Sequence, residues 1–183
     1  MDPNPADDSI RDLLALTLTP GVGPLTGRAL LERFGTARAV LDATAAELRE
    51  VQGIGPKLAD RIRHARGDND PDREIAEARA MGATLVPRGS PGYPPTLEEI
   101  PDPPALLYVK GAFEPRDQIG IALVGSRRCT PYGIRTAERL AAALARTGFT
   151  VVSGLARGID AAAHRGALKA GGRTIAVLGN GLS

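Results

Sequence analysis

Residues 120–178 decide the fold, and they read GIALVGSRRCTPYGIRTAERLAAALARTGFTVVSGLARGIDAAAHRGALKAGGRTIAVL. Short apolar runs alternate with longer helical patterns, giving expected strands at 121–124, 150–152 and 174–178 and expected helices at 131–147 and 160–170. The first run is continuously apolar, which is typical of a strand buried on both faces. This alternation predicts a parallel sheet with right-handed crossovers, and therefore an α/β, Rossmann-like domain.

The sequence ends with GNGLS (179–183), directly after the last of these predicted strands. A doubly wound α/β sheet seldom ends at that point, because further helices and strands normally follow. We therefore expect the chain to contain the N-terminal part of a Rossmann-like domain that is incomplete at its C-terminus.

A different pattern fills the N-terminal third of the chain. The turns PGVGP (20–24) and GIGP (53–56) lie 32 residues apart, and each leads into a helical pattern. Such paired turns predict an all-α helix-hairpin-helix (SAM-like) domain, which we place at residues 9–66. The hydrophilic stretch 67–71 is the expected linker, and the Rossmann-like domain is expected at residues 72–183.

The start of that second domain has a mixed pattern. A short helix is expected at 72–81, followed by strands at 83–86 and 106–109. The segment between the two strands, Pro87 to Pro104, is rich in Pro and Gly. We expect no regular structure in it.

The second hairpin turn has the features of a phosphate site. A Gly-apolar-Gly turn presents backbone N–H groups at a helix N-terminus, and these groups hold a phosphate oxygen without reading a base. Gly53 and Gly55 form such a turn, and Lys57 and Arg61 add positive charge behind it. We expect these four residues to contact a DNA backbone. The alternative is a helical module used only for packing or protein contact.

The end of the first sheet strand is also suited to an anion. Gly125 would let a ligand approach the backbone closely, and Ser126 offers a hydroxyl group. Thr130 is expected to cap the next helix, whose free N–H groups then face the crevice where open α/β sheets bind ligands. Arg127 and Arg128 add charged donors suited to bidentate phosphate contact.

The end of the second sheet strand carries similar residues. Ser153 and Gly154 end the strand, and Arg157 lies in the loop that follows. Asp160 is expected to cap the next helix and to hydrogen-bond His164 one turn later. No dinucleotide or Walker A pattern follows either strand, so we expect no nucleotide cofactor, and no metal site is indicated. The alternative for these glycines is ordinary turn chemistry.

Composition and charge limit the class of protein. Residues 1–115 carry 13 Lys and Arg against 18 Asp and Glu, whereas residues 116–183 carry 10 against 3. A basic C-terminal part suggests a polyanionic partner, although an Arg-rich helix surface alone would give the same balance. Cys129 is the only cysteine, which rules out an intramolecular disulfide. We find no signal peptide and no apolar run of membrane-spanning length, so we expect a soluble cytoplasmic protein.

Three groups of residues carry a family resemblance. They are YPPTL (93–97) with IPDPP (100–104) and LYVKG (107–111); VGSR (124–127) with TPYG (130–133); and SGLARGIDAAAH (153–164) with GRTIAVLG (172–179). With the hairpin domain in front of them, they make residues 10–183 resemble the DNA-processing protein A family (DprA, also called Smf).

The resemblance implies a protein without enzymatic activity. Members bind and protect single-stranded DNA that enters the cell in natural transformation, load the recombinase RecA onto it, and dimerise through the Rossmann-like domain. By motif position, Arg127 is the residue expected to hold DNA. The residues expected to line its pocket or to lie close by are Gly125, Ser126, Thr130, Ser153, Gly154 and Arg157. Family members continue through further strands and a Lys-Ser-Gly loop that are not found here.

Two other functions remain open at this stage. Related Rossmann-like folds hydrolyse nucleotide conjugates, as in the cytokinin-activating phosphoribohydrolases, but their Pro-Gly-Gly-x-Gly-Thr-x-x-Glu motif is not in the sequence. The chain would otherwise be an adaptor whose hairpin domain binds another protein. Aromatic residues are scarce, and only Tyr132 is well placed to stack on a base. A bound single strand should therefore be held mainly by arginine–phosphate contacts.

Overall fold

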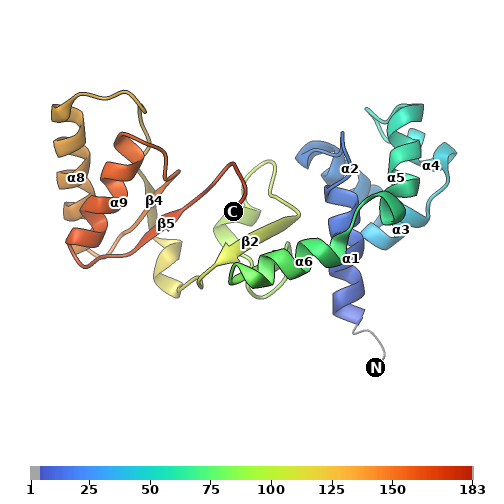
Figure 1. The fold of residues 1–183 in the computed structure, drawn as a ribbon, viewed down its shortest axis with the longest axis horizontal. Coiled ribbons are helices and arrows are strands. Elements are labelled where there is room, and N and C mark those ends of the chain that lie inside the picture. The colour runs from blue at the N-terminus through green and yellow to red at the C-terminus, as the bar shows by residue number, and fades with distance from the viewer. Residues whose placement is uncertain (1–4, 183) are drawn as a thin grey trace. The chain divides into compact units, whose positions relative to one another are not determined.

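The computed structural model describes residues 5–182, and the chain divides into two compact units, residues 1–112 and 113–183 (Figure 1). The first unit contains the predicted helical domain and also residues 72–112, which the sequence patterns assigned to the Rossmann-like domain. The limits 9–66 and 72–183 are limits of sequence patterns, and they remain a prediction.

The predicted all-α domain consists of five helices: α1 (Pro5–Thr17), α2 (Pro24–Phe34), α3 (Ala37–Asp42), α4 (Ala45–Arg49) and α5 (Pro56–Asp68). One apolar core joins them. Leu16, Leu30, Val40, Leu48 and Ile62 are completely buried in this core, and each of them comes from a different helix. The hairpin turns thus bring five short amphipathic helices together around one apolar core. None of these helices could bury its own apolar side chains alone.

The starts of these helices follow from the sequence. Pro24 and Pro56 occupy the first turns of α2 and α5, where the fixed φ of proline suits a helix and its missing N–H costs nothing. Thr36 and Thr44 cap α3 and α4, because each hydroxyl oxygen accepts a backbone N–H three residues further on.

The rest of the first unit packs a helix and a two-stranded antiparallel sheet together. Its elements are α6 (Pro71–Ala80), β1 (Ala83–Pro87), α7 (Pro95–Glu98) and β2 (Leu106–Lys110). The sheet pairs Leu85 with Tyr108, and the loop between the strands is anchored by Tyr93, whose hydroxyl donates to the Pro104 carbonyl at 2.8 Å.

Two local features of this region differ from the sequence patterns. Three residues of the predicted linker 67–71 are helical, because α5 continues through Asp68 and α6 starts at Pro71 with Asp70 as its cap, while the linker itself remains a prediction. The cap explains the early start, since the Asp70 carboxylate accepts the backbone N–H of Arg73 at 3.0 Å. The loop from Pro87 to Pro104, expected to be irregular, contains the short helix α7.

The second unit is a three-stranded parallel sheet with two helices, as predicted. Its elements are the 3-10 helix η1 (Pro115–Gln118), β3 (Gly120–Ala122), α8 (Pro131–Arg146), β4 (Thr150–Ser153), α9 (Ile159–Lys169) and β5 (Thr174–Ala176). The strand order is β3-β4-β5. Ala141 and Ala145 of α8, Val151 of β4, and Ala163 and Ala167 of α9 form its apolar core.

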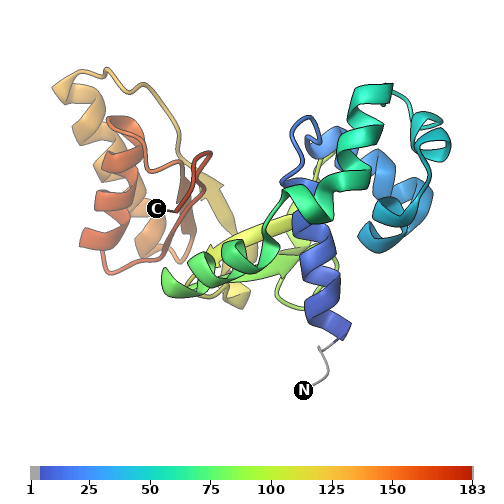
Figure 2. The ribbon, with the colours of Figure 1, turned by 45° about the vertical axis from the view of Figure 1, so that its right-hand side comes forward.

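Within the described residues of this unit, 113–182, helices cover one face of the sheet. Figures 1 and 2 show α8 and α9 side by side against the same face of the strands. Both crossovers run in the same direction along the sheet, and crossovers of one hand then put their helices on one face. The prediction that residues 121–124 are buried on both faces is therefore wrong: Ala122 is exposed, and Val124 is 71% exposed.

An ion-pair network closes the amino ends of the strands. The Arg173 guanidinium donates to both carboxylate oxygens of Asp117, at 2.5 and 2.7 Å, and to Glu114 at 2.7 Å. Asp117 also accepts the hydroxyl of Thr150 at 2.9 Å. The network lowers the pKa of Asp117 to about 2, chiefly through the bonds from Arg173. It ties η1 to the first residue of β4 and to the residue before β5.

Candidate nucleic-acid interface

Two loops meet at the carboxyl edge of the parallel sheet. The loop after β3 runs to Thr130, the loop after β4 runs to Gly158, and parallel pairing of the two strands puts both loops at the same edge. Two hydrogen bonds join the first loop to the start of α9 (Ile159–Lys169), where the second loop ends. The backbone N–H of Ile159 donates to the Ser126 carbonyl at 3.2 Å, and the backbone N–H of Gly125 donates to the Asp160 carboxylate at 3.1 Å.

Close packing of the two loops depends on Gly125 and Gly158. A Cβ atom on Gly158 would lie 2.3 Å from the carbonyl oxygen of Ser126, and one on Gly125 would lie 2.8 Å from the Ile159 side chain. Gly125 was expected to let a ligand approach the backbone. In the structure Ile159 occupies the place of a Gly125 Cβ and the Gly125 amide donates to Asp160, so this exposed glycine packs the loops together.

Three arginines project from the joined loops. Arg127, Arg128 and Arg157 are exposed, and their guanidinium groups have no hydrogen bond or ion pair to any of residues 5–182. The nearby Asp160 carboxylate does not neutralise the positive charges of these arginines at the surface. It is buried, and it accepts the backbone N–H of Gly125. The predicted charged donors are thus present together and are unoccupied.

The predicted hydroxyl groups are mostly used within the protein. The Ser126 hydroxyl exchanges hydrogen bonds with the backbone of Arg128, at 3.0 and 3.1 Å. Ser153 is buried, and its hydroxyl donates to the Leu123 carbonyl at 2.6 Å, which ties β4 to β3. Thr130 caps α8 as predicted, because its oxygen accepts the backbone N–H of Gly133 at 3.2 Å.

Gly154 is half-buried and closely packed. A Cβ atom there would lie 2.8 Å from the carboxylate of Asp160. Among the predicted sheet-edge side chains, the three arginines are therefore the charged groups that make no hydrogen bond or ion pair to residues 5–182. In a sequence, serine and glycine at strand ends look like residues that contact a ligand. Here they pack and hydrogen-bond within the loops that hold the arginines.

The predicted roles of Asp160 and His164 are wrong in detail. Gly158 precedes α9 as its cap residue, and Asp160 lies inside the first turn. The His164 Nδ1 atom is 2.6 Å from the Thr174 hydroxyl, which itself donates to the Val151 carbonyl. Thr174 must therefore accept from His164, which fixes the Nδ1–H tautomer. Burial lowers the pKa of His164 despite the opposing effect of Asp160.

The second hairpin turn keeps part of its predicted character. Gly55 precedes α5 without a side-chain cap, which leaves the first-turn amide groups without a capping side chain. Lys57 is exposed and has no ion pair within the described part of the chain. Arg61 differs, because its guanidinium donates to the Pro20 carbonyl at 3.1 Å and so joins the two hairpin turns.

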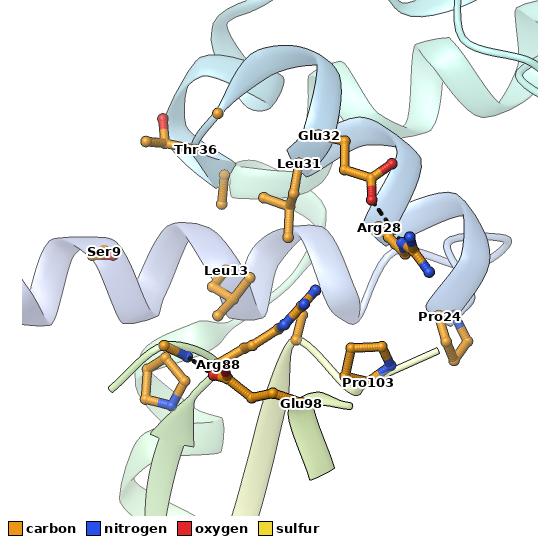
Figure 3. A pocket seen from close by; sticks show the side chains of 15 residues that line it. Ser9, Leu13, Pro24, Arg28, Leu31, Glu32, Thr36, Arg88, Glu98 and Pro103 are labelled. Carbon is orange, nitrogen blue, oxygen red and sulfur yellow. Dashed lines mark hydrogen bonds and ion pairs between the residues drawn. The ribbon is translucent and has the colours of Figure 1, made fainter. Parts of the chain in front are cut away.

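A cleft in the first unit was not predicted from the sequence. It has a volume of about 500 Å³ and lies between α1, α2 and the loops around β1 and β2. Figure 3 shows Arg28 and Glu32 on one wall and Arg88 and Glu98 on the other. Arg28 donates to Glu32 at 2.7 Å, and Glu98 accepts the backbone N–H of Gly89 at 3.0 Å. The lining contains both acidic and basic side chains, some of which already form hydrogen bonds with the protein. It therefore lacks the uniformly positive charge that binding of a polyanion requires.

Residues 5–182 lack two further features. No helix in this range is both long enough and apolar enough to pass through a bilayer. The same residues contain no group of His, Cys, Asp and Glu side chains suited to holding a metal ion.

Comparison with known proteins gives two family matches. Residues 84–183 match the family described as DNA recombination-mediator protein A, and residues 10–68 match the SAM-like helix-hairpin-helix tandem. The "Protein Smf" of Synechocystis is 39% identical over 173 residues, which are 92% of this chain and 44% of that protein. The DNA processing protein DprA of Streptococcus pneumoniae is 47% identical over 90 residues, 49% of this chain and 32% of the relative.

The fold comparison agrees with the sequence comparison. The X-ray structure of DNA processing protein A from Streptococcus pneumoniae is similar with a TM-score of 0.71 and 28% sequence identity. The similarity covers 100% of this chain and 60% of that structure. The chain thus spans less than two thirds of the length of these relatives.

Proposed function

Because this chain belongs to the DNA recombination-mediator protein A family, we propose that it binds single-stranded DNA for transfer to the recombinase RecA in natural transformation. The observation that carries the proposal is the group of three free guanidinium groups, from Arg127, Arg128 and Arg157, at the carboxyl edge of the sheet. Polyanion binding at this edge agrees with the usual position of ligands in open α/β sheets.

The proposed contact is with the phosphate backbone. Guanidinium groups pair with phosphate oxygens through two parallel hydrogen bonds, and such contacts carry no base information. The loops that carry the three arginines are already held by one backbone–backbone bond and by the bond from the Gly125 amide to the Asp160 carboxylate, so binding does not have to order them. We therefore propose weakly sequence-selective binding in which Arg127 is the main contact and Arg128 and Arg157 assist.

The hairpin turn at residues 53–56 is the proposed second contact. The first-turn amide groups of α5 and the free Lys57 suit one phosphate. Gly53 and Gly55 shape this turn. Arg61 would act indirectly, since its guanidinium is engaged with Pro20. The remaining sheet-edge residues, Gly125, Ser126, Thr130, Ser153 and Gly154, would support the arginines.

The wider role is proposed on the family alone. Members are recombination mediators, so we propose a cytoplasmic protein without catalysis or cofactor, which acts with RecA and assembles as a homodimer in its full-length form.

Binding of a labelled single-stranded oligonucleotide, followed by fluorescence anisotropy over a range of salt concentrations, tests the proposal. We expect salt-dependent binding that a duplex competitor displaces poorly, and a clear loss of affinity in Arg127→Ala. Each lost phosphate contact should reduce the slope of log K against log salt concentration by about 0.7. Lys57→Gln measures the hairpin contact in the same assay, and Arg33→Gln in the first unit is the control.

Failure has a clear form in this assay. Binding that does not depend on salt, or that is equal for wild type and Arg127→Ala, would remove the sheet-edge arginines from the proposal. Absence of binding by the wild-type chain would refute DNA binding by these residues.

A further inference from the structure

Helix α8 presents a row of exposed residues along its length. Tyr132, Arg135, Arg139 and Arg146 are all exposed, with Tyr132 at 70%. An α-helix turns by about 100° per residue, so these four positions fall within a sector of about 60°. We call them the α8 stripe. Arg135 and Arg146 are 11 residues apart, which corresponds to about 17 Å along the helix axis.

The three arginines of the α8 stripe form no ion pair with a carboxylate of the described residues 5–182. In residues 113–182 there are four acidic side chains, and each is engaged elsewhere. Glu114 and Asp117 bind Arg173, and Asp160 accepts the Gly125 amide. Glu138, although it lies on α8, pairs with Arg165 and Lys169 of α9 at 2.9 and 3.5 Å.

The positive charge of this unit is therefore concentrated. Six exposed arginines lack a hydrogen bond or ion pair of their side chains to the described residues: Arg127, Arg128 and Arg157 at the sheet edge, and Arg135, Arg139 and Arg146 on α8. The two groups are continuous in the chain, since the loop that holds Arg127 and Arg128 leads directly into the first turn of α8. A row of like charges attracts a partner with regularly repeated negative charge.

We propose that the α8 stripe is a second phosphate-binding surface, along which a single strand continues after it leaves the sheet-edge arginines. This inference rests on the proposed function. A nucleic-acid strand suits the stripe better than an acidic protein does, because its charges repeat along a line, as the three arginines do. Tyr132 stands where the two surfaces meet, and its exposed ring provides a face on which one base stacks.

The test removes the stripe charges without shortening the helix. The variant Arg135→Gln/Arg139→Gln/Arg146→Gln keeps good helix formers on α8, and its far-UV circular dichroism should equal that of wild type. The matched control, Arg116→Gln/Arg165→Gln/Lys169→Gln, removes the same number of cations from the same unit. Salt-dependent anisotropy is measured with oligonucleotides of about 5 and about 20 nucleotides.

We expect an effect that depends on strand length. With the longer oligonucleotide, the stripe variant should lose about 2 from the slope of log K against log salt concentration, about 0.7 for each lost contact. With the shorter one, its affinity should equal that of wild type, because the sheet-edge arginines suffice. Tyr132→Ala should weaken binding of the longer strand and leave the slope unchanged.

The two proposals fail in different ways. If Arg127→Ala weakens binding but the stripe variant matches the charge-matched control, the stripe proposal is overturned and the proposed function stands. An equal loss with both oligonucleotides would also overturn it, since that is the effect of net charge alone. If the wild-type chain binds neither oligonucleotide, the proposed function fails, and the stripe proposal fails with it.

Discussion

Replacing Asp117 by Asn tests whether the ion-pair network at the amino ends of the strands stabilises the parallel unit. The Asp117 side chain is only 9% exposed and accepts bonds from Arg173, from Thr150 and from the Glu114 amide. These bonds lower its pKa from the ordinary 3.8 to about 2. A shift of that size, at about 1.4 kcal/mol per pKa unit, gives about 2 kcal/mol of stability at neutral pH.

The sign of the pH dependence follows from the direction of the shift. A carboxylate whose pKa is lowered by folding contributes its full stability above the unfolded value of 3.8. That contribution is lost as the pH falls from 3.8 through about 2, where the folded carboxylate takes up its proton. Asp117→Asn should therefore be about 2 kcal/mol less stable than wild type at neutral pH, and this difference should shrink toward pH 2.

Urea unfolding followed by far-UV circular dichroism measures the effect. The quantity of interest is the difference between wild type and variant at each pH, because other carboxyl groups titrate in both proteins. Arg116→Gln is the control: it removes a more exposed ion pair with Glu114 and should cost less than about 1 kcal/mol. A difference between wild type and Asp117→Asn that stays constant from neutral pH to about pH 2 would refute the electrostatic reasoning.

Two further predictions concern the sheet edge and its buried histidine. Gly158→Ala should destabilise the protein and weaken DNA binding, because φ is +87° and the new Cβ would meet the Ser126 carbonyl oxygen at 2.3 Å. Gly148→Ala, with φ of +92° and open space around it, shows the cost of backbone strain alone in the same thermal melt. His164 should titrate below 6.5 when its ring protons are followed by NMR, because burial favours the neutral ring; a midpoint above 6.5 would contradict the structure.

The sequence predicted the order of the elements well, because strand and helix periodicities differ clearly between residues 120 and 178. It did not predict that Val124 would be exposed. A continuous apolar run shows that a strand is suited to burial, but which face is covered depends on the side to which each crossover turns. The start of α6 at Pro71 depended on Asp70, a local cap in a stretch that otherwise has the composition of a linker.

The sequence predicted the charged residues of the candidate site, but it did not predict the contacts that hold the two loops together. The uneven distribution of Lys and Arg pointed to the arginines that the structure leaves free. The packing of Ile159 against Gly125 joins residues 34 positions apart, and no local pattern reveals such a contact. The hydrogen bond of Ser153 could not be foreseen for the same reason, because its partner, the Leu123 carbonyl, lies directly after the neighbouring strand β3.

The joined loops at the sheet edge also restrict how the sequence can change over time. Ile159 occupies the volume next to Gly125, and the Ser126 carbonyl occupies the volume next to Gly158. A larger residue at position 125 is accommodated only with a smaller one at 159, and a side chain at 158 only after the peptide at 126 moves. Positions 125, 126, 158 and 159 should therefore change together among descendants of one ancestor. Packing does not tie the three arginines beside them to one another, so only their contact with a ligand restricts them.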